Sequence, residues 1–450
     1  MRKNKAIIIL SLVLLTLSVS AIYAQNQTNK DASLKTILTN CSIIDCTGRK
    51  PMNNMTVIIT GSRITQINQG PYKKPSNKKH IRIFDLQGWY VLPGLWNVHS
   101  HLDDLLPDPK NILIDEPVGS SAIRAGRNAM DALRRGFTGI RIVGERDYLD
   151  VAWRDAFNAG VFIGPRLFVC GNPITATGGH GWEPVGPVAI QIDGPYEMRK
   201  TIREHIKHGV DWIKIMDTEL RPDELKEAIE TAHQRGLRVA AHSGAPTTKM
   251  SVLAGIDSIE HGTGIDDETI KLMAEKGVFY VPTIVCNLSA EYIQEREQRL
   301  AKLGFNVPKE VAKGRTMVSY ADERSPKGAK RQREILLKAV KAGVKICTGG
   351  DSNPIGELGL LEIEQFVLSG MTEMQALIAA TRNCADLCNV LDELGTVEVG
   401  KYADLIVVSE NPLDNISNLR RLKMVFKDGN LVNLKPQEGQ ASYWKLYFLE

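Results

Sequence analysis

The middle of this 450-residue chain alternates short apolar runs with longer stretches in which apolar positions recur every three to four residues. The short runs predict buried strands, and the longer stretches predict amphipathic helices, such as those over residues 222–235 and 267–276. The strand candidates are residues 95–98, 138–143, 167–169, 212–216, 239–241, 258–259, 278–285 and 344–347.

Glycines end several of the predicted helices directly before the next strand, because glycine readily takes the left-handed conformation that terminates a helix. These glycines are Gly136, Gly209, Gly236, Gly277 and Gly343. Repeated strand–helix units predict an α/β fold, and eight of them close a (β/α)8 TIM-type barrel. We expect that barrel over residues 92–394, with a helical insertion near its mouth between strands seven and eight.

Both ends of the chain have a different pattern, in which short apolar runs are separated by turn-forming residues. Residues 61–63 predict a hairpin tip, and residues 427–430 predict a second turn. The simplest arrangement is one small β-sandwich domain that residues 33–91 and 395–435 form together, with the barrel inserted between them.

The first 24 residues have the pattern of a secretory signal peptide. Arg2, Lys3 and Lys5 precede an apolar run over residues 6–18, and small or neutral residues follow down to Ala24. The run is short for a membrane span. We therefore expect a periplasmic or secreted protein without a membrane anchor, and an uncleaved anchor helix is the alternative.

The composition limits the classes of partner that the sequence indicates. The 56 lysines and arginines nearly balance 52 acids, so the net charge of +4 gives no indication of nucleic-acid binding. Seven scattered cysteines form no CxxC pair and are better explained as small buried residues.

Side chains suited to metal binding stand at the carboxyl ends of five predicted strands. They are His99 and His101, Lys214, His242, His261, and Asp351. Alternation puts His99 and His101 on one face of their strand, and the strand ends of a barrel meet at one mouth. Each residue alone has a structural explanation, but the joint pattern indicates a metal site.

Imidazole and carboxylate are ligands that zinc, manganese and cobalt prefer. Lys214 lies in an otherwise apolar strand. Burial beside cations should lower its pKa, so that the neutral amine can add carbon dioxide and form a carbamate. A carbamate can bridge two metal ions, and a hydroxide held between them would be the nucleophile.

This pattern resembles the amidohydrolase superfamily in its binuclear, carboxylated-lysine form, and more narrowly the imidazolonepropionase-like group that holds Xaa-Pro dipeptidases. The matching motifs are residues 91–95 leading to His99-Ser100-His101, residues 258–262, and residues 395–405 with 411–413. The resemblance implies two zinc ions and a small-molecule substrate.

Position by position, the resemblance places His99, His101 and Asp351 on the first metal and His242 and His261 on the second. Lys214, carboxylated by CO2, bridges the two. Asp351 would carry the proton from the bridging water to the leaving amine. His180, in a glycine-rich loop over residues 177–181, would contact the substrate carbonyl, and Arg141 is a second candidate substrate contact.

Two departures concern specificity. Ile142 follows Arg141 where relatives often have an acid, and Ser243-Gly244 follow His242 where dipeptidase-like members often carry an aromatic residue. The expected reaction is hydrolysis of an amide-type C–N bond, in a dipeptide or N-acyl amino acid.

The alternatives are a cyclic-amide (imidazolone-type) hydrolase, a one-metal deaminase that would not need Lys214, and, least favoured, a non-catalytic binding protein. A homo-oligomer is possible. Basic residues of the insertion are candidates to meet a substrate carboxylate: Arg296, Arg299, Arg315 and Lys330.

Overall fold

The computed structural model describes residues 34–73, 80–103, 117–181, 188–304 and 326–435. The predicted signal peptide lies outside these residues, as does Arg315.

One sheet joins the two ends of the chain. Its strands are β1 (Lys35–Ile43), β2 (Met52–Thr60), β3 (Arg63–Gln69), β4 (Ile81–Asp85), β5 (Tyr90–Pro93), β15 (Leu405–Val408), β16 (Leu422–Lys427) and β17 (Asn430–Leu431). The order is β17-β16-β15-β5-β1-β2-β3, with β4 also paired to β1. Strand β5 makes the junction, because it pairs with β1 in parallel and with β15 antiparallel.

The hairpin predicted at residues 61–63 links β2 to β3, which pair from Thr60 and Arg63 onward. Apolar side chains from both ends pack together on this sheet, among them Leu38, Val57, Leu405 and Phe426. Both chain ends therefore share one sheet and one apolar cluster. Its completion as a sandwich of two facing sheets remains a prediction.

Parallel strands make up the middle of the chain. A three-stranded sheet contains β6 (Leu95–Ser100), β7 (Phe137–Ile142) and β8 (Arg166–Phe168). A six-stranded sheet has the order β10-β9-β11-β12-β13-β14, formed by β9 (Ile174–Ala176), β10 (Ile190–Ile192), β11 (Trp212–Met216), β12 (Arg238–Gly244), β13 (Ser258–Thr263) and β14 (Phe279–Val281).

Backbone hydrogen bonds continue beyond both sheets. Trp212 of β11 donates to the carbonyl oxygen of Val169, just after β8, over 3.0 Å. Cys347 donates to Tyr280 of β14 over 2.9 Å, and Val98 of β6 donates to Thr348 over 2.8 Å. Residues 345–348 thus lie between β14 and β6.

Two strand predictions need correction. Residues 344–347, predicted as the eighth strand, make only an isolated bridge between Tyr280 and Ile346 in the described structure. The strand predicted over residues 278–285 ends at Val281. Pro282 lacks an N–H for a ladder, and Thr283 then turns the chain into the short helix η2 (Ile284–Asn287). The strands therefore divide between two parallel sheets in the described residues.

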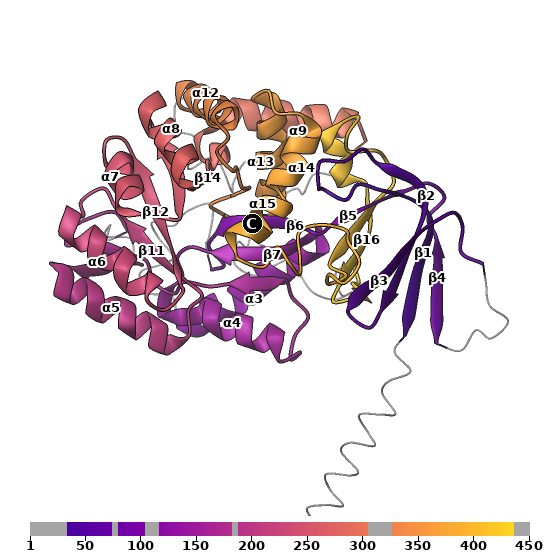
Figure 1. The fold of residues 1–450 in the computed structure, drawn as a ribbon, viewed down its shortest axis with the longest axis horizontal. Helices are drawn as coiled ribbons and strands as arrows, with labels where there is room; N and C mark the ends of the chain where they lie inside the picture. The colour runs from indigo at the N-terminus through magenta and orange to yellow at the C-terminus, as the bar shows by residue number, and fades with distance from the viewer. Residues whose placement is uncertain (1–33, 74–79, 104–116, 182–187, 305–325, 436–450) are drawn as a thin grey trace, which may run out of the picture.

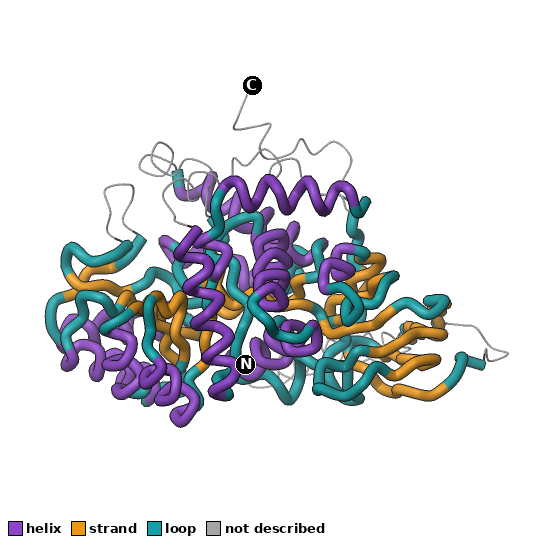
Figure 2. The backbone as a smooth tube through the Cα atoms, turned by 90° about the horizontal axis from the view of Figure 1, so that it is seen from above, coloured by secondary structure: helices purple, strands orange, loops and turns teal. Residues whose placement is uncertain are grey.

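Helices cover the parallel strands, and the sheet of the chain ends lies to one side of them (Figures 1 and 2). They are α3 (Val118–Arg134), α4 (Leu149–Asn158), α5 (Pro195–His208), α6 (Pro222–His233), α7 (Thr247–Ala254), α8 (Asp267–Lys276), α9 (Ala290–Lys302), α12 (Pro326–Ala342), α13 (Ile355–Leu368), α14 (Glu373–Ala379) and α15 (Arg382–Leu387), with the short helices η1 (Arg146–Tyr148) and η3 (Ile416–Arg420).

The helices predicted at 222–235 and 267–276 are confirmed as α6 and α8. Helix α8 ends at Gly277, whose φ of 70° is the left-handed conformation expected of a terminating glycine. The insertion is helical at both of its described ends, in α9 and α12.

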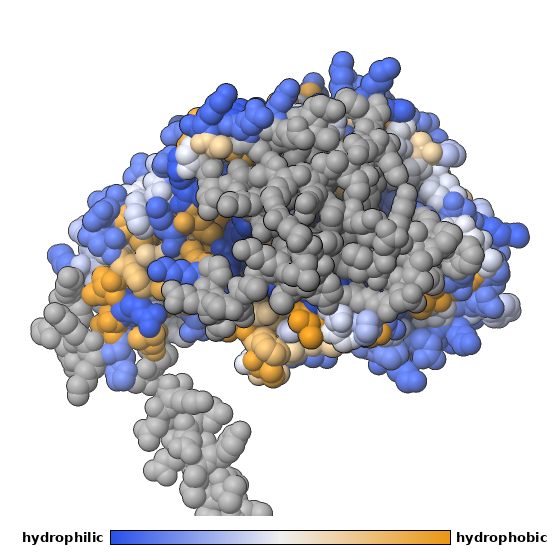
Figure 3. Space-filling model, turned by 180° about the vertical axis from the view of Figure 1, so that it is seen from behind, coloured by the Kyte–Doolittle hydropathy of each residue, from blue (hydrophilic) through white to orange (hydrophobic). Residues whose placement is uncertain are grey.

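Charged and polar side chains cover most of the coloured surface on the face opposite to Figure 1, and apolar side chains gather in a few separate groups (Figure 3). Within the described part of the chain, no helix is both long and apolar enough to span a membrane.

Candidate metal centre

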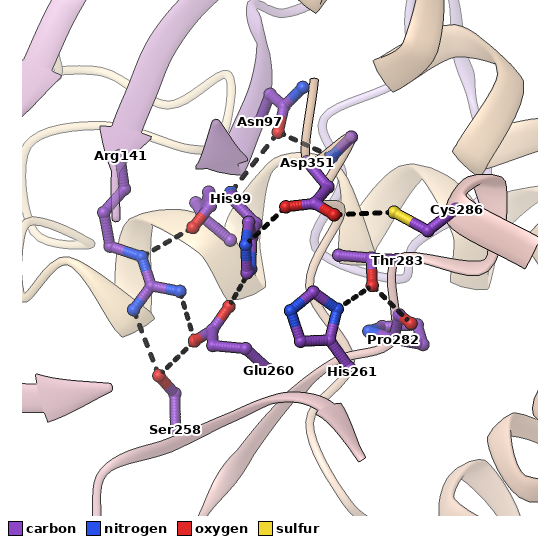
Figure 4. A network of polar contacts seen from close by, with 12 residues as sticks. Asn97, His99, Arg141, Ser258, Glu260, His261, Pro282, Thr283, Cys286 and Asp351 are labelled. Carbon is purple, nitrogen blue, oxygen red and sulfur yellow. Dashed lines mark hydrogen bonds and ion pairs between the residues drawn. The ribbon is translucent and has the colours of Figure 1, made fainter. Parts of the chain in front are cut away.

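Three predicted ligands lie close together. His99 belongs to β6, His261 belongs to β13, and Asp351 follows residues 345–348. His99, His261 and Asp351 each offer a ligand atom, and these atoms lie within 4.8 Å of one another. Asp351 Oδ1 is 3.0 Å from His99 Nε2 and 3.5 Å from His101 Nε2. The backbone brings them together, because Asp351 N donates to the His99 carbonyl oxygen over 2.8 Å. Figure 4 shows this arrangement.

The first two imidazoles are each held through Nδ1. His99 Nδ1 lies 2.7 Å from Glu260 Oε2, and His101 Nδ1 lies 2.7 Å from the Gly144 carbonyl oxygen. An ionised carboxylate and a carbonyl can only accept, so both Nδ1 atoms carry the proton and donate. Each Nε2 faces Asp351 Oδ1 and is the ring atom that would bind a metal ion.

The His261 ring is held by a hydroxyl group instead of a carboxylate or carbonyl. Thr283 Oγ1 donates its single proton to the Pro282 carbonyl oxygen over 2.8 Å, so it must accept from His261 Nδ1 at 2.6 Å. The Nε2 of His261 is therefore also a free acceptor. Burial, reinforced by His242, holds the pKa of His261 well below its usual range, which keeps the ring neutral.

His242 and His180 extend the row of rings. The His242 ring lies 4.4 Å from the His261 ring and 4.4 Å from the His180 ring, measured between centroids. Burial, with a contribution from Lys214, lowers the pKa of His242 to about 2, so it too is neutral. His180 is exposed, on the loop after β9, and so stands at the rim of the cluster.

Lys214 lies in β11 and is only 1% exposed. Its Nζ has no hydrogen-bond partner among the described residues. Burial lowers the pKa of this amine, Arg141 lowers it further, and Glu260 opposes the change. A buried amine without a partner is costly, so its presence beside this ligand set fits a group that is completed by carbon dioxide and divalent cations.

Glu260 lies within the motif of residues 258–262, and the sequence alone assigned it no role. Its Oε1 accepts from Arg141 Nη2 at 2.6 Å and from the Ser258 hydroxyl at 2.6 Å, while Oε2 accepts from His99. Burial would raise the pKa of Glu260, but Arg141 and His99 outweigh it and hold the pKa well below its ordinary value. The carboxylate is therefore ionised and bound on both oxygens.

The prediction that Arg141 contacts substrate is not supported by its position. Its side chain is fully buried, and its other bonds go to the Val98 carbonyl oxygen at 2.6 Å and the Ser258 hydroxyl at 3.0 Å. The guanidinium reaches from β7 across to Glu260 of β13, and so it holds a residue that itself holds His99. Arg296 is likewise buried, paired with Glu357 and Glu364.

Asp351 has a different partner on each oxygen. Oδ1 faces the imidazoles, and Oδ2 accepts from the Cys286 thiol at 2.8 Å. Burial alone would raise the pKa of Asp351, but His99 and His101 hold it well below its usual range. The carboxylate is thus ionised and available as a ligand or a proton acceptor.

Three non-glycine residues in this cluster have left-handed backbones. The φ angles are 65° at His261, 47° at Thr283 and 61° at Asp351. This conformation costs about 1 kcal/mol or more for each residue and is least favourable for β-branched threonine. Such strain concentrates at functional sites, where the surrounding structure enforces it.

Known proteins with similar sequences include a family and a characterised relative. A sequence model described as "Amidohydrolase family" matches residues 90–432. Ochratoxinase of Aspergillus niger is 30% identical over 387 residues, which cover 76% of this chain and 75% of that protein.

Solved structures are also similar to this chain over most of its length. A Xaa-Pro dipeptidase with bound methionine superposes with a TM-score of 0.75 at 29% identity, covering 88% of this chain and 99% of that one. A prolidase complexed with N-methylphosphonate-L-proline gives a TM-score of 0.74 at 27% identity, with the same coverage of each chain.

Proposed function

This chain belongs to the amidohydrolase family, whose members act on small molecules, and from that premise we propose that it hydrolyses the amide bond of a dipeptide or an N-acyl amino acid. The observation that carries the proposal is the convergence of imidazole rings on Asp351, beside the buried Lys214 amine, which has no hydrogen-bond partner among the described residues. Similarity to a Xaa-Pro dipeptidase and a prolidase supports the dipeptide class.

The residues that would hold two zinc ions are His99, His101 and Asp351 for the first and His242 and His261 for the second, with carboxylated Lys214 between them. When bound, the cations supply polarisation of the scissile carbonyl and a lowered pKa of the attacking water. The unpartnered amine favours this two-metal arrangement over the one-metal deaminase alternative.

The protein's own groups then move the proton. Asp351, whose pKa is held well below its usual range, would accept a proton from the attacking water and deliver it to the leaving nitrogen. Cys286 donates to Oδ2, so Oδ1 is the oxygen that faces His99 and His101. His180, exposed at the rim beside His242, donates to the substrate carbonyl.

The two parallel sheets and residues 345–348 are, in this proposal, one (β/α)8 barrel over residues 92–394. The backbone bonds between Trp212 and Val169 and between Val98 and Thr348 support it, because the first joins β11 to the end of β8 and the second joins β6 to residues 345–348. The proposal also retains the composite β-sandwich domain of residues 33–91 and 395–435, and export after residue 24.

The test is a substrate screen of the purified, zinc-loaded protein. Dipeptides, N-acetyl amino acids and the same compounds amidated at the C-terminus are compared by release of free amine. Hydrolysis of the free acids, with clearly slower turnover of the amidated series, is expected. Equal rates would remove carboxylate recognition, and activity confined to cyclic amides or lactones would overturn the proposal.

A further inference from the structure

Cys286 stands directly against the carboxylate to which the proposed function gives the proton. Its Sγ donates to Asp351 Oδ2 at 2.8 Å, on the side of the carboxylate away from His99 (Figure 4). Asp351 Oδ1 faces His99 and His101. We propose that Cys286 is a positioning residue that keeps Asp351 turned with Oδ1 toward the imidazoles. This inference rests on the proposed function.

The turn that carries Cys286 is fixed from behind. Glu362, fully buried on α13, accepts the backbone N–H of Ile284 at 2.9 Å and that of Val285 at 3.0 Å, one on each carboxyl oxygen. Both donors belong to η2, the short helix that contains Cys286. The thiol is therefore presented by a turn with a set position.

The same turn also supports a second predicted ligand. Thr283, directly before η2, accepts from His261 Nδ1 and so fixes that ring (Figure 4). One short segment thus holds His261 through a hydroxyl and Asp351 through a thiol. Neither support is one of the predicted ligands.

Cys286 differs from the other cysteines in its surroundings. All seven cysteines lie in described residues; six are buried, and Cys286 alone is partly exposed. Cys41 is a suitable control, because its thiol is directed to the Met55 carbonyl oxygen at 3.3 Å, within the sheet of the chain ends. Removing its sulfur removes a buried thiol without touching Asp351.

The chemistry requires a neutral donor at residue 286. A thiol donates one weak hydrogen bond to the carboxylate and adds no charge. Without it, Asp351 can rotate about its side-chain bonds, so that Oδ1 spends less time facing the imidazoles. Serine has a shorter side chain but a stronger donor, and it should restore the contact in part.

The experiment compares Cys286→Ala, Cys286→Ser and Cys41→Ala in the full chain, by zinc retention against a competing chelator and by kcat and KM on N-acetyl amino acids. Cys286→Ala should lower kcat about tenfold, with KM nearly unchanged, the effect of one hydrogen bond to a charged group. It should also release zinc at lower chelator concentration. Cys286→Ser should recover part of both kcat and zinc retention, and Cys41→Ala should match the wild type in both.

Two results would overturn the inference. One is wild-type kcat and zinc retention in Cys286→Ala. The other is a Cys286→Ser variant as defective as Cys286→Ala, which would show that sulfur packing matters and donation does not. If Cys286→Ala fails to fold, methyl methanethiosulfonate on the folded wild type replaces the S–H with a methyl disulfide, releasing methanesulfinate, and unchanged zinc retention in that adduct would be equally decisive.

Failure of the proposed function would look different. A wild-type protein that hydrolyses no amide contradicts that function, while the comparison of zinc retention still decides whether Cys286 positions Asp351.

Discussion

His99 Nδ1 lies 2.7 Å from Glu260 Oε2, and both side chains are almost completely buried. Because the carboxylate can only accept, His99 donates its Nδ1 proton to Glu260, and this contact turns Nε2 toward Asp351. Arg141 holds the other oxygen of Glu260. A chain of three residues, from β7 through β13 to β6, therefore sets the orientation of a single predicted ligand.

Glu260→Gln should lower zinc affinity about 10- to 100-fold, the usual effect of losing such a support. Competition with a chelator measures the zinc affinity of the variant and of wild type. Glu393→Gln is a matched control, because Glu393 forms an exposed pair with Arg63 that contributes little to stability. Equal zinc affinity in Glu260→Gln and wild type would show that His99 needs no carboxylate behind it.

Arg141→Lys tests the revised role of that arginine. Lysine cannot reproduce the guanidinium's bonds to three acceptors, so we expect a loss of about 2–3 kcal/mol in the free energy of unfolding. Because the side chain is buried away from solvent, KM should stay within about twofold of wild type while kcat falls. Denaturant unfolding and steady-state kinetics check both. A large rise in KM with normal stability would restore the substrate contact.

Glu362 predicts a pH dependence of stability. Burial raises the pKa of this carboxyl to about 8, against the lowering effect of the Ile284 and Val285 N–H groups. A raised folded-state pKa means that the native state holds a proton that the unfolded chain has lost. The contribution of Glu362 to the free energy of unfolding is therefore complete below about pH 4.5, and it is lost as pH rises toward about 8.

Thermal unfolding of metal-free wild type and Glu362→Gln across that range checks this sign. The amide cannot ionise and so does not share the loss. The advantage of wild type over Glu362→Gln should be greatest at the acidic end and should shrink as pH rises. A difference in unfolding temperature between wild type and Glu362→Gln that is constant with pH would contradict this prediction.

Much of the ligand set followed from sequence, for a physical reason. Strand alternation and the shared carboxyl edge of parallel strands placed His99, His261 and Asp351 together, and the structure has them within 4.8 Å. Glu260 could have been found, because a carboxylate directly before a histidine in an apolar strand needs a partner.

The supports from the turn after β14 could not be found in this way. Thr283 and Cys286 reach residues 22 and 65 positions away along the chain, with no periodicity to signal the contacts. The pairing of Arg141 with Glu260 could not be found either, because a sequence does not tell whether a long cationic side chain points to solvent or across the core.

Lys214→Met should separate stability from function. Methionine has a similar length and needs no hydrogen-bond partner, so the metal-free variant should be at least as stable as wild type. It cannot form a carbamate, so activity and zinc content should both fall. Lys214→Ala should also lower activity and zinc content, and short carboxylic acids should partly restore its activity. Lys214→Arg should remain inactive. Full activity in Lys214→Met would refute the role of the amine.

Anomalous diffraction at the zinc edge, from crystals of the zinc-loaded wild-type protein, tests the two-metal site most directly. We expect two zinc peaks, one among His99, His101 and Asp351 and one beside His242 and His261, with forked density extending from Lys214 Nζ between them. A single peak, with the Lys214 side chain ending at its amine, would contradict the carboxylated, two-metal centre.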